Sequence, residues 1–310
     1  MKINFDNYLG SKPFLYGRKL LKDLGTKSHY VDEYDAIGFF GYEVKKIKQI
    51  DYPEYADTIG ELFDDRAVAV KISEKNLILI SDKLPPKRER STIFHEAGHE
   101  SIPWHPHFNH SLREKDIDPI TQIKIEREAF HASSEVWFPL KHFINDLLSL
   151  PLSFKAINNL AERYNGSFEA TCIRYALTNP NILAIVVVKE NIPLEYQIIP
   201  PDHNNRLPLF PDIPTDKRIK LIPPAPLRVQ YCSRSYRFPR FIKSGTEIEQ
   251  GNIIYDCWVK KMNIKREIPS SVFGSSTPFK YQAECLYHYG RIFVLLSIPD
   301  KQMSFFAGLN

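Results

Sequence analysis

The chain has 310 residues, of which 43% are hydrophobic and 25% are charged, with a net charge of +4. This composition is typical of a globular protein, and the length allows two domains or one domain with an appendage. The charge is too small to indicate nucleic-acid binding by itself. The four cysteines lie far apart, which excludes a disulfide framework or a cysteine zinc knuckle and favours a reducing compartment.

The sequence lacks the features of an exported or membrane-spanning protein. Residues 1–10 have no apolar run of the signal-peptide type. The longest apolar run, residues 182–188, is far too short to cross a bilayer. We therefore expect a cytoplasmic protein that makes no membrane contact.

The first part of the chain predicts two helices followed by strands. Residues 15–25 and 31–40 have helical apolar spacing, and a glycine ends each stretch. Residues 42–50 are a predicted strand, and residues 66–80 are a predicted hairpin with its turn at 74–76. An exposed edge of this sheet could bind an extended peptide, whereas strands that only cover the core would show the same pattern.

Residues 95–99 read His-Glu-Ala-Gly-His. Residues four apart share one face of a helix, so His95 and His99 can present imidazole nitrogens to one metal ion. Glu96 lies beside them around the helix and can act on a water molecule without being a ligand. Zn²⁺ accepts imidazole and carboxylate donors. A solvated helix surface is the alternative, but the apolar and small residues around the histidines favour a buried metal-binding helix.

A catalytic zinc site needs a third protein ligand. Residues 118–139 predict a long helix with a proline near each end. This helix carries two candidate carboxylates, Glu126 and Glu128. Ala129 and Ser133 share a face with Glu126 and are small enough to let the helix approach the histidine helix closely. We therefore assign Glu126 as the third ligand and keep Glu128 as the alternative.

Six segments follow one another along roughly the first 180 residues. They are Ile78-Leu79-Ile80-Ser81, Lys87-Arg88-Glu89-Arg90, the histidine helix, Ile102-Pro103-Trp104-His105, Glu126-Arg127-Glu128-Ala129 and Ser134-Glu135-Val136-Trp137-Phe138-Pro139. In this order they resemble the ImmA/IrrE family of metallopeptidases. The resemblance implies a zincin-like domain in which His95, His99 and Glu126 bind zinc and Glu96 is the general base.

The resemblance also bears on partners and on activity. It implies a protein substrate, a helix-turn-helix transcriptional repressor that is cleaved after stress, DNA damage or a phage signal. The family usually has asparagine where this chain has Phe130 and phenylalanine where it has Ala132. Phe130 cannot supply a hydrogen bond that would orient a ligand histidine. The alternative function is a non-catalytic regulator that binds a repressor or single-stranded nucleic acid.

Three further histidines lie between the two predicted zinc helices, at His105, His107 and His110. Histidines near a metal could add a ligand or a donor that stabilises an oxyanion. Because a proline interrupts the segment, we interpret it as a loop with surface histidines and assign none of them to the site.

Residues 151–180 predict two short helices joined by a turn at Asn165 and Gly166, with Ser167 as the N-cap of the second helix. This outline resembles a helix-turn-helix. In the family the segment packs mostly as structure, so we do not assign DNA reading to it.

The sequence after Pro180 favours strands and implies a change of domain. Together the patterns predict an α+β protein with a zincin-like metallopeptidase domain at 1–147, a helix-turn-helix-like segment at 148–180 and a β-rich C-terminal domain at 181–310. The resemblance implies that this last domain is sensor-like, as in relatives where it is GAF-like. The predicted strands cover residues 182–188, 194–199, 253–259 and 292–298, and prolines crowd residues 200–226.

Arginines alternate with aromatic residues between Arg228 and Phe241. Such a pattern can follow a phosphate backbone while its rings stack on bases, which would fit single-stranded DNA as an activator. A half-buried strand with solvated arginines is the simpler interpretation.

Overall fold

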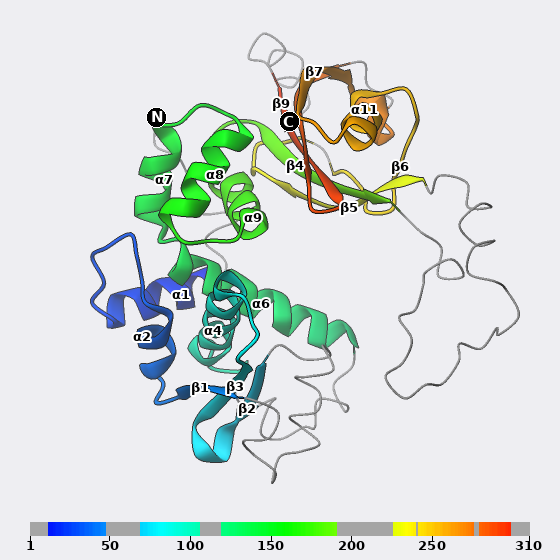
Figure 1. Cartoon of the computed structure of the whole chain (residues 1–310). Helices are drawn as coiled ribbons and strands as arrows, with labels where there is room; N and C mark the ends of the chain where they lie inside the picture. Colours follow the sequence, from blue (N-terminus) through cyan, green and yellow to red (C-terminus); the bar gives the residue numbers. More distant parts are fainter. Residues whose placement is uncertain are drawn as a thin grey trace, which may run out of the picture. The chain divides into compact units, whose positions relative to one another are not determined.

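The computed structural model describes residues 12–47, 69–105, 119–190, 226–239, 241–275 and 279–298. The chain divides into two compact units, Met1–Asn179 and Pro180–Asn310 (Figure 1). Both units combine helices with strands, so the predicted α+β class is confirmed. In the part of the chain described, no helix has the length and apolar character needed to span a membrane.

The first unit contains a small sheet in which β3 lies between β1 and β2, parallel to β1 and antiparallel to β2. The strands are β1 (Glu43–Ile47), β2 (Ala69–Ile72) and β3 (Leu77–Ser81). The described helices are α1 (Lys12–Asp23), α2 (Glu33–Gly38), α4 (Pro86–Ser101), α6 (Pro119–Trp137), α7 (Leu140–Leu148), α8 (Phe154–Arg163) and α9 (Phe168–Thr178).

Local signals set the end of the first helix and the start of the second. Gly25 has φ 65° and donates its N–H to the Lys22 carbonyl, which ends α1 where the sequence predicted. α2 begins later than expected because the Asp32 carboxylate caps it, accepting the N–H groups of Tyr34 and Asp35. The predicted hairpin is confirmed between β2 and β3, while residues 48–50 and 66–68 of the predicted strands lie outside the described residues.

Two glycines let the helices that surround α6 touch its backbone. A Cβ atom at Gly98 of α4 would lie 2.4 Å from the Ala129 carbonyl oxygen, and one at Gly17 of α1 would lie 2.3 Å from the Ala132 carbonyl oxygen. The Ser133 Cβ lies 3.1 Å from the same position at Gly98. The predicted close approach of the two helices along Ala129 and Ser133 is therefore confirmed.

The helix-turn-helix outline is present in α8 and α9, and Ser167 caps α9 by accepting the Ala170 N–H. A DNA-reading helix presents basic side chains to the groove. The only basic residue of α9, Arg174, is 1% exposed and donates to the Glu135 carboxylate at 2.9 Å and to the Phe138 carbonyl at 2.8 Å. The arginine of α9 is therefore buried within the first unit and is not presented to a DNA groove.

The second unit is a curled antiparallel sheet in the order β6-β5-β4-β9-β8-β7, and α11 packs against one face of it (Figure 1). Alternate residues of β4, including Ala184 and Val186, share a core with Ile254 and Cys257 of α11. The elements are β4 (Leu183–Glu190), β5 (Leu227–Arg234), β6 (Glu247–Ile248), α11 (Ile253–Lys260), β7 (Ile264–Pro269), β8 (Lys280–His288) and β9 (Arg291–Ser297).

The predicted strands at 182–188 and 292–298 are confirmed as β4 and β9, but the predicted strand at 253–259 is wrong. That segment is α11. Its Asn252 side chain accepts two backbone N–H groups of the first turn, and residues at helical spacing face the core. Residues 194–199 lie outside the described residues, and the sheet alone does not establish a GAF-like domain.

The three described arginines between 228 and 241 have local partners, and Arg240 lies outside the described residues. Arg228 pairs with Glu247 at 3.0 Å, Arg234 donates to the Phe238 carbonyl, and Arg237 donates to the Pro180 carbonyl. The structure therefore does not support single-stranded DNA as an activator bound along this stretch. The half-buried strand is the better interpretation, since β5 pairs with β4 and β6.

Candidate metal centre

α4 places both histidines of the motif at one site. Ile93, Phe94 and Ala97 are fully buried and hold this helix in the interior of the first unit. His95 and His99 are one turn apart, so their rings project to the same side. The His95 side chain keeps 27% of its surface exposed, whereas that of His99 keeps 9%.

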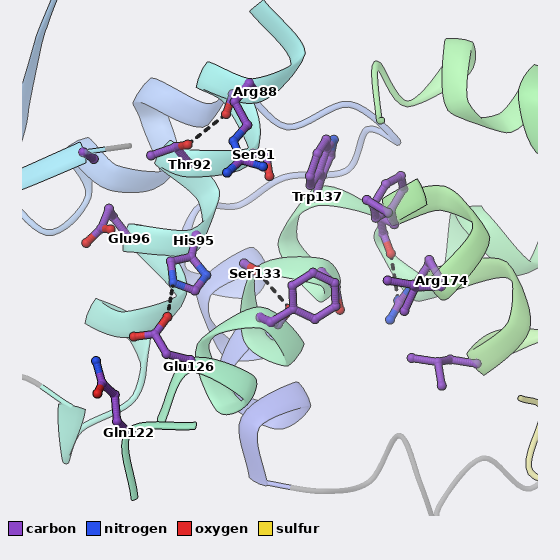
Figure 2. A pocket seen from close by; sticks show the side chains of 17 residues that line it. Arg88, Ser91, Thr92, His95, Glu96, Gln122, Glu126, Ser133, Trp137 and Arg174 are labelled. Carbon is purple, nitrogen blue, oxygen red and sulfur yellow. Dashed lines mark hydrogen bonds and ion pairs between the residues drawn. The ribbon is translucent and has the colours of Figure 1, made fainter. Parts of the chain in front are cut away.

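The donor atoms of His95, His99 and Glu126 converge. His95 Nε2 lies 2.9 Å from Glu126 Oε2 and 3.1 Å from His99 Nε2, and His99 Nε2 lies 3.6 Å from Glu126 Oε1. Figure 2 shows the His95 ring and the Glu126 carboxylate pointing toward one another. A tetrahedral zinc ion with bonds near 2.1 Å holds neighbouring ligand atoms about 3.4 Å apart. The two imidazoles and the carboxylate therefore fit zinc in both chemistry and spacing.

The side chains of this cluster shift the pKa values of one another. Hydrogen bonds from His95 and His99 hold the pKa of Glu126 far below its usual range, outweighing its partial burial. Burial would lower the pKa of His95, but its hydrogen bond to Glu126 and the charges of Glu96 and Glu126 raise that pKa overall. The His95 imidazole and the Glu126 carboxylate therefore each favour the charged form of the other.

Glu96 lines a cavity of about 550 Å³ together with His95 and Glu126 but does not belong to the converging donor group. Figure 2 shows it extending from α4 beside the ligand pair. The cavity walls come from α4, α6, α9 and β2. The other lining residues are Ala69, Arg88, Ser91, Thr92, Gln122, Phe130, Ser133, Ser134, Trp137, Phe138, Ala170, Ile173, Arg174 and Leu177.

The alternative carboxylate, Glu128, has other partners. Its Oε2 atom accepts hydrogen bonds from Trp104 Nε1 at 2.9 Å and from His105 Nε2 at 3.2 Å. Of the two candidates, the structure brings Glu126 to the motif histidines.

The interpretation of the intervening segment as a loop with surface histidines is wrong for His105. This residue is 1% exposed, and its Nδ1 atom lies 3.0 Å from His99 Nδ1. A turn after α4, in which the His105 N–H donates to the Ile102 carbonyl, folds the ring back into the interior. Ile102, directly after the helix, is also fully buried. His107 and His110 lie outside the described residues.

Acidification should destabilise the protein through His131. Burial, followed by the charges of Arg127 and Arg174, lowers the pKa of His131 from 6.5 to about 4. The unfolded chain therefore binds a proton between these values that the folded chain does not, and stability falls as the pH falls from 6.5 to 4, by up to about 3 kcal/mol. Urea unfolding across this range should show a flatter pH dependence for His131→Phe, which keeps the stacking on Phe14, than for the native chain.

His142→Phe on α7 is the matched control for the loss of an imidazole at another position. If the free energy of unfolding depends on pH equally steeply in the native chain and in His131→Phe, the lowered pKa of His131 is not the cause of the acid destabilisation.

Part of the chain is similar to a known domain family. Residues 56–175 match the family model of the IrrE N-terminal-like domain of peptidase family M78. A solved structure described as a Mycobacterium tuberculosis transcriptional regulator shares the fold, with a TM-score of 0.55 and 11% identity over 98% of this chain and 82% of that chain. No curated protein matches the sequence. Residues 56–175 thus resemble an IrrE N-terminal-like domain, and the predicted resemblance to the ImmA/IrrE family is confirmed for this part of the chain.

Proposed function

We propose that this protein is a zinc-dependent endopeptidase that cleaves a partner protein. The observation that carries the proposal is the convergence of His95, His99 and Glu126, because two of these residues, His95 and Glu126, line a cavity that Glu96 also lines. A zinc peptidase needs three protein ligands and a general base at one place, and these four residues would supply both.

Each residue would have a separate role in hydrolysis. His95, His99 and Glu126 would hold zinc, which supplies Lewis acidity for peptide-bond hydrolysis when bound. Glu96 would accept a proton from the attacking water and pass it to the leaving amine. The negative charge of the ionised Glu126 would partly offset the positive charge of the zinc ion.

The cavity also suggests how a peptide is held. Phe130, Ile173 and Leu177 line it and provide apolar surface for a substrate side chain. Ala69 of β2 lines the same cavity, and β2 lies at one edge of the sheet formed by the described strands. An extended peptide could pair with this edge and cross the site. By the family resemblance, the substrate is a helix-turn-helix repressor that is cut after stress, DNA damage or a phage signal.

A cleavage assay tests the proposal. Purified zinc-loaded protein is incubated with a helix-turn-helix repressor from the same genome, and the products are identified by mass spectrometry. The native chain should cut the repressor, and Glu96→Gln should lower the rate by roughly 10²–10⁴-fold because the proton acceptor is lost.

Glu100→Gln is the matched control. Glu100 is one turn further along α4 and pairs with Lys71 at 2.7 Å, outside the ligand cluster. This variant should retain cleavage. Stable repressor binding without a cut by the native chain would instead support the non-catalytic regulator.

A further inference from the structure

His99 is the more buried of the two motif histidines, and its second ring nitrogen has a specific partner. The His99 Nδ1 atom lies 3.0 Å from His105 Nδ1, and His105 Nε2 lies 3.2 Å from Glu128 Oε2. The same Glu128 oxygen accepts the Trp104 Nε1–H at 2.9 Å. The His105 side chain is completely buried, and the Glu128 side chain keeps only 17% exposure.

We infer that His105 and Glu128 form a hydrogen-bonded relay that positions His99 for zinc. This inference rests on the proposed zinc site. His105 and Glu128 are positioning residues, because neither contributes an atom to the converging donor group.

The positions of the ring protons on His99 and His105 fix the direction of every hydrogen bond in the relay. A ligand imidazole uses the lone pair of its metal-facing nitrogen, which is Nε2 in His99, so the His99 proton must be on Nδ1. This Nδ1–H can donate to His105 only if His105 Nδ1 has no proton. The single proton of a neutral His105 is then on Nε2 and donates to Glu128, which accepts from both His105 and Trp104. Every contact in the series therefore has one donor and one acceptor.

The relay explains how this chain can orient His99 without a polar side chain at position 130. Phe130 has no hydrogen-bonding group, whereas metal-bound histidines usually donate their second N–H to a carboxylate, carbonyl or water. Here an intervening imidazole links that N–H to a carboxylate. α6 thus provides the proposed ligand Glu126 and, two residues later, the end of the relay at Glu128.

The test measures zinc affinity in the full chain by competition with a chromophoric chelator. His105→Leu and Glu128→Ala should each weaken zinc binding roughly 10–100-fold, the range for loss of an outer hydrogen-bond partner. His105→Gln should restore most of the affinity, because its amide can accept from His99 and donate to Glu128. His142→Leu, a histidine substitution on α7, should leave the affinity unchanged.

A second measurement needs no variant. Long-range ¹H–¹⁵N spectra of the zinc-loaded native chain should show His105 as the Nε2–H tautomer and His99 as the Nδ1–H tautomer. If His105 had a purely structural role, His105→Gln would not recover zinc affinity, and this pair of tautomers would not be needed.

The outcomes separate the relay from the zinc site. Native affinity in His105→Leu, or a His105 tautomer protonated on Nδ1, overturns the relay and leaves the zinc site in place. Absence of zinc binding in the native chain, with His95→Ala behaving identically, overturns both.

Discussion

Replacing Glu126 by glutamine should weaken zinc binding by more than about 100-fold and abolish cleavage. The loss should exceed the range for an outer hydrogen-bond partner, because the carboxylate itself approaches both histidines, at 2.9 Å and 3.6 Å. The neutral amide leaves a site with two imidazoles and no anionic ligand, which is one protein ligand fewer than catalytic zinc sites use. Chelator competition on the full chain measures this loss directly.

The pH dependence of zinc binding should change in the same variant. The hydrogen bond and charge of Glu126 raise the pKa of His95 against the effect of burial, so protons compete with zinc at a higher pH than for an ordinary histidine. In Glu126→Gln the pKa of His95 falls, and the pH at which proton competition begins should move down.

Gln122→Ala is the control for Glu126→Gln. Gln122 lines the same cavity one turn earlier on α6 and does not belong to the converging donor group, so this variant should bind zinc like the native chain. If Glu126→Gln binds zinc with native affinity and native pH dependence, Glu126 is not a ligand.

Local geometry was enough to predict that the three proposed ligand residues lie close together. The spacing of His95 and His99 places them on one helical face whatever the rest of the fold is. The choice of Glu126 over Glu128 followed from small residues on one face of the helix, and Gly98 confirms the contact at Ala129.

The position of His105 could not be predicted in this way. Its burial depends on a turn that folds back between helices, and such a return is decided by tertiary packing. A proline after a histidine carries the same local signal in an exposed loop and in a buried turn.

The error at α11 has a related cause. Ile253, Ile254 and Tyr255 have high strand propensity, which favoured a strand. The Asn252 cap and the burial of Ile254 and Cys257 on one helical face outweigh that local preference. Local patterns also cannot predict the order of the strands in the large sheet. β4 pairs with β9, which lies more than a hundred residues later in the chain, and this pairing places Leu183 opposite Ser297.

Replacing Gly98 by alanine should destabilise the protein and weaken zinc binding together. In most helices Gly→Ala stabilises by about 1 kcal/mol, because glycine loses more backbone entropy on folding. Here the new Cβ would lie 2.4 Å from the Ala129 carbonyl oxygen, so α4 and α6 must separate. Overpacking of this kind costs roughly 1–3 kcal/mol. Because α4 holds His95 and α6 holds Glu126, the same separation should pull the proposed ligands apart.

Gly38→Ala is the matched control, because Gly38 is also helical and a Cβ atom added there would have no neighbouring atom within 4 Å. Chemical denaturation should show Gly38→Ala at or above native stability and Gly98→Ala clearly below it. Chelator competition should show weaker zinc binding only in Gly98→Ala. If Gly98→Ala is as stable as the control and binds zinc normally, the contact at Ala129 does not set the spacing of the two helices. The metal site would then owe its geometry to other contacts between α4 and α6.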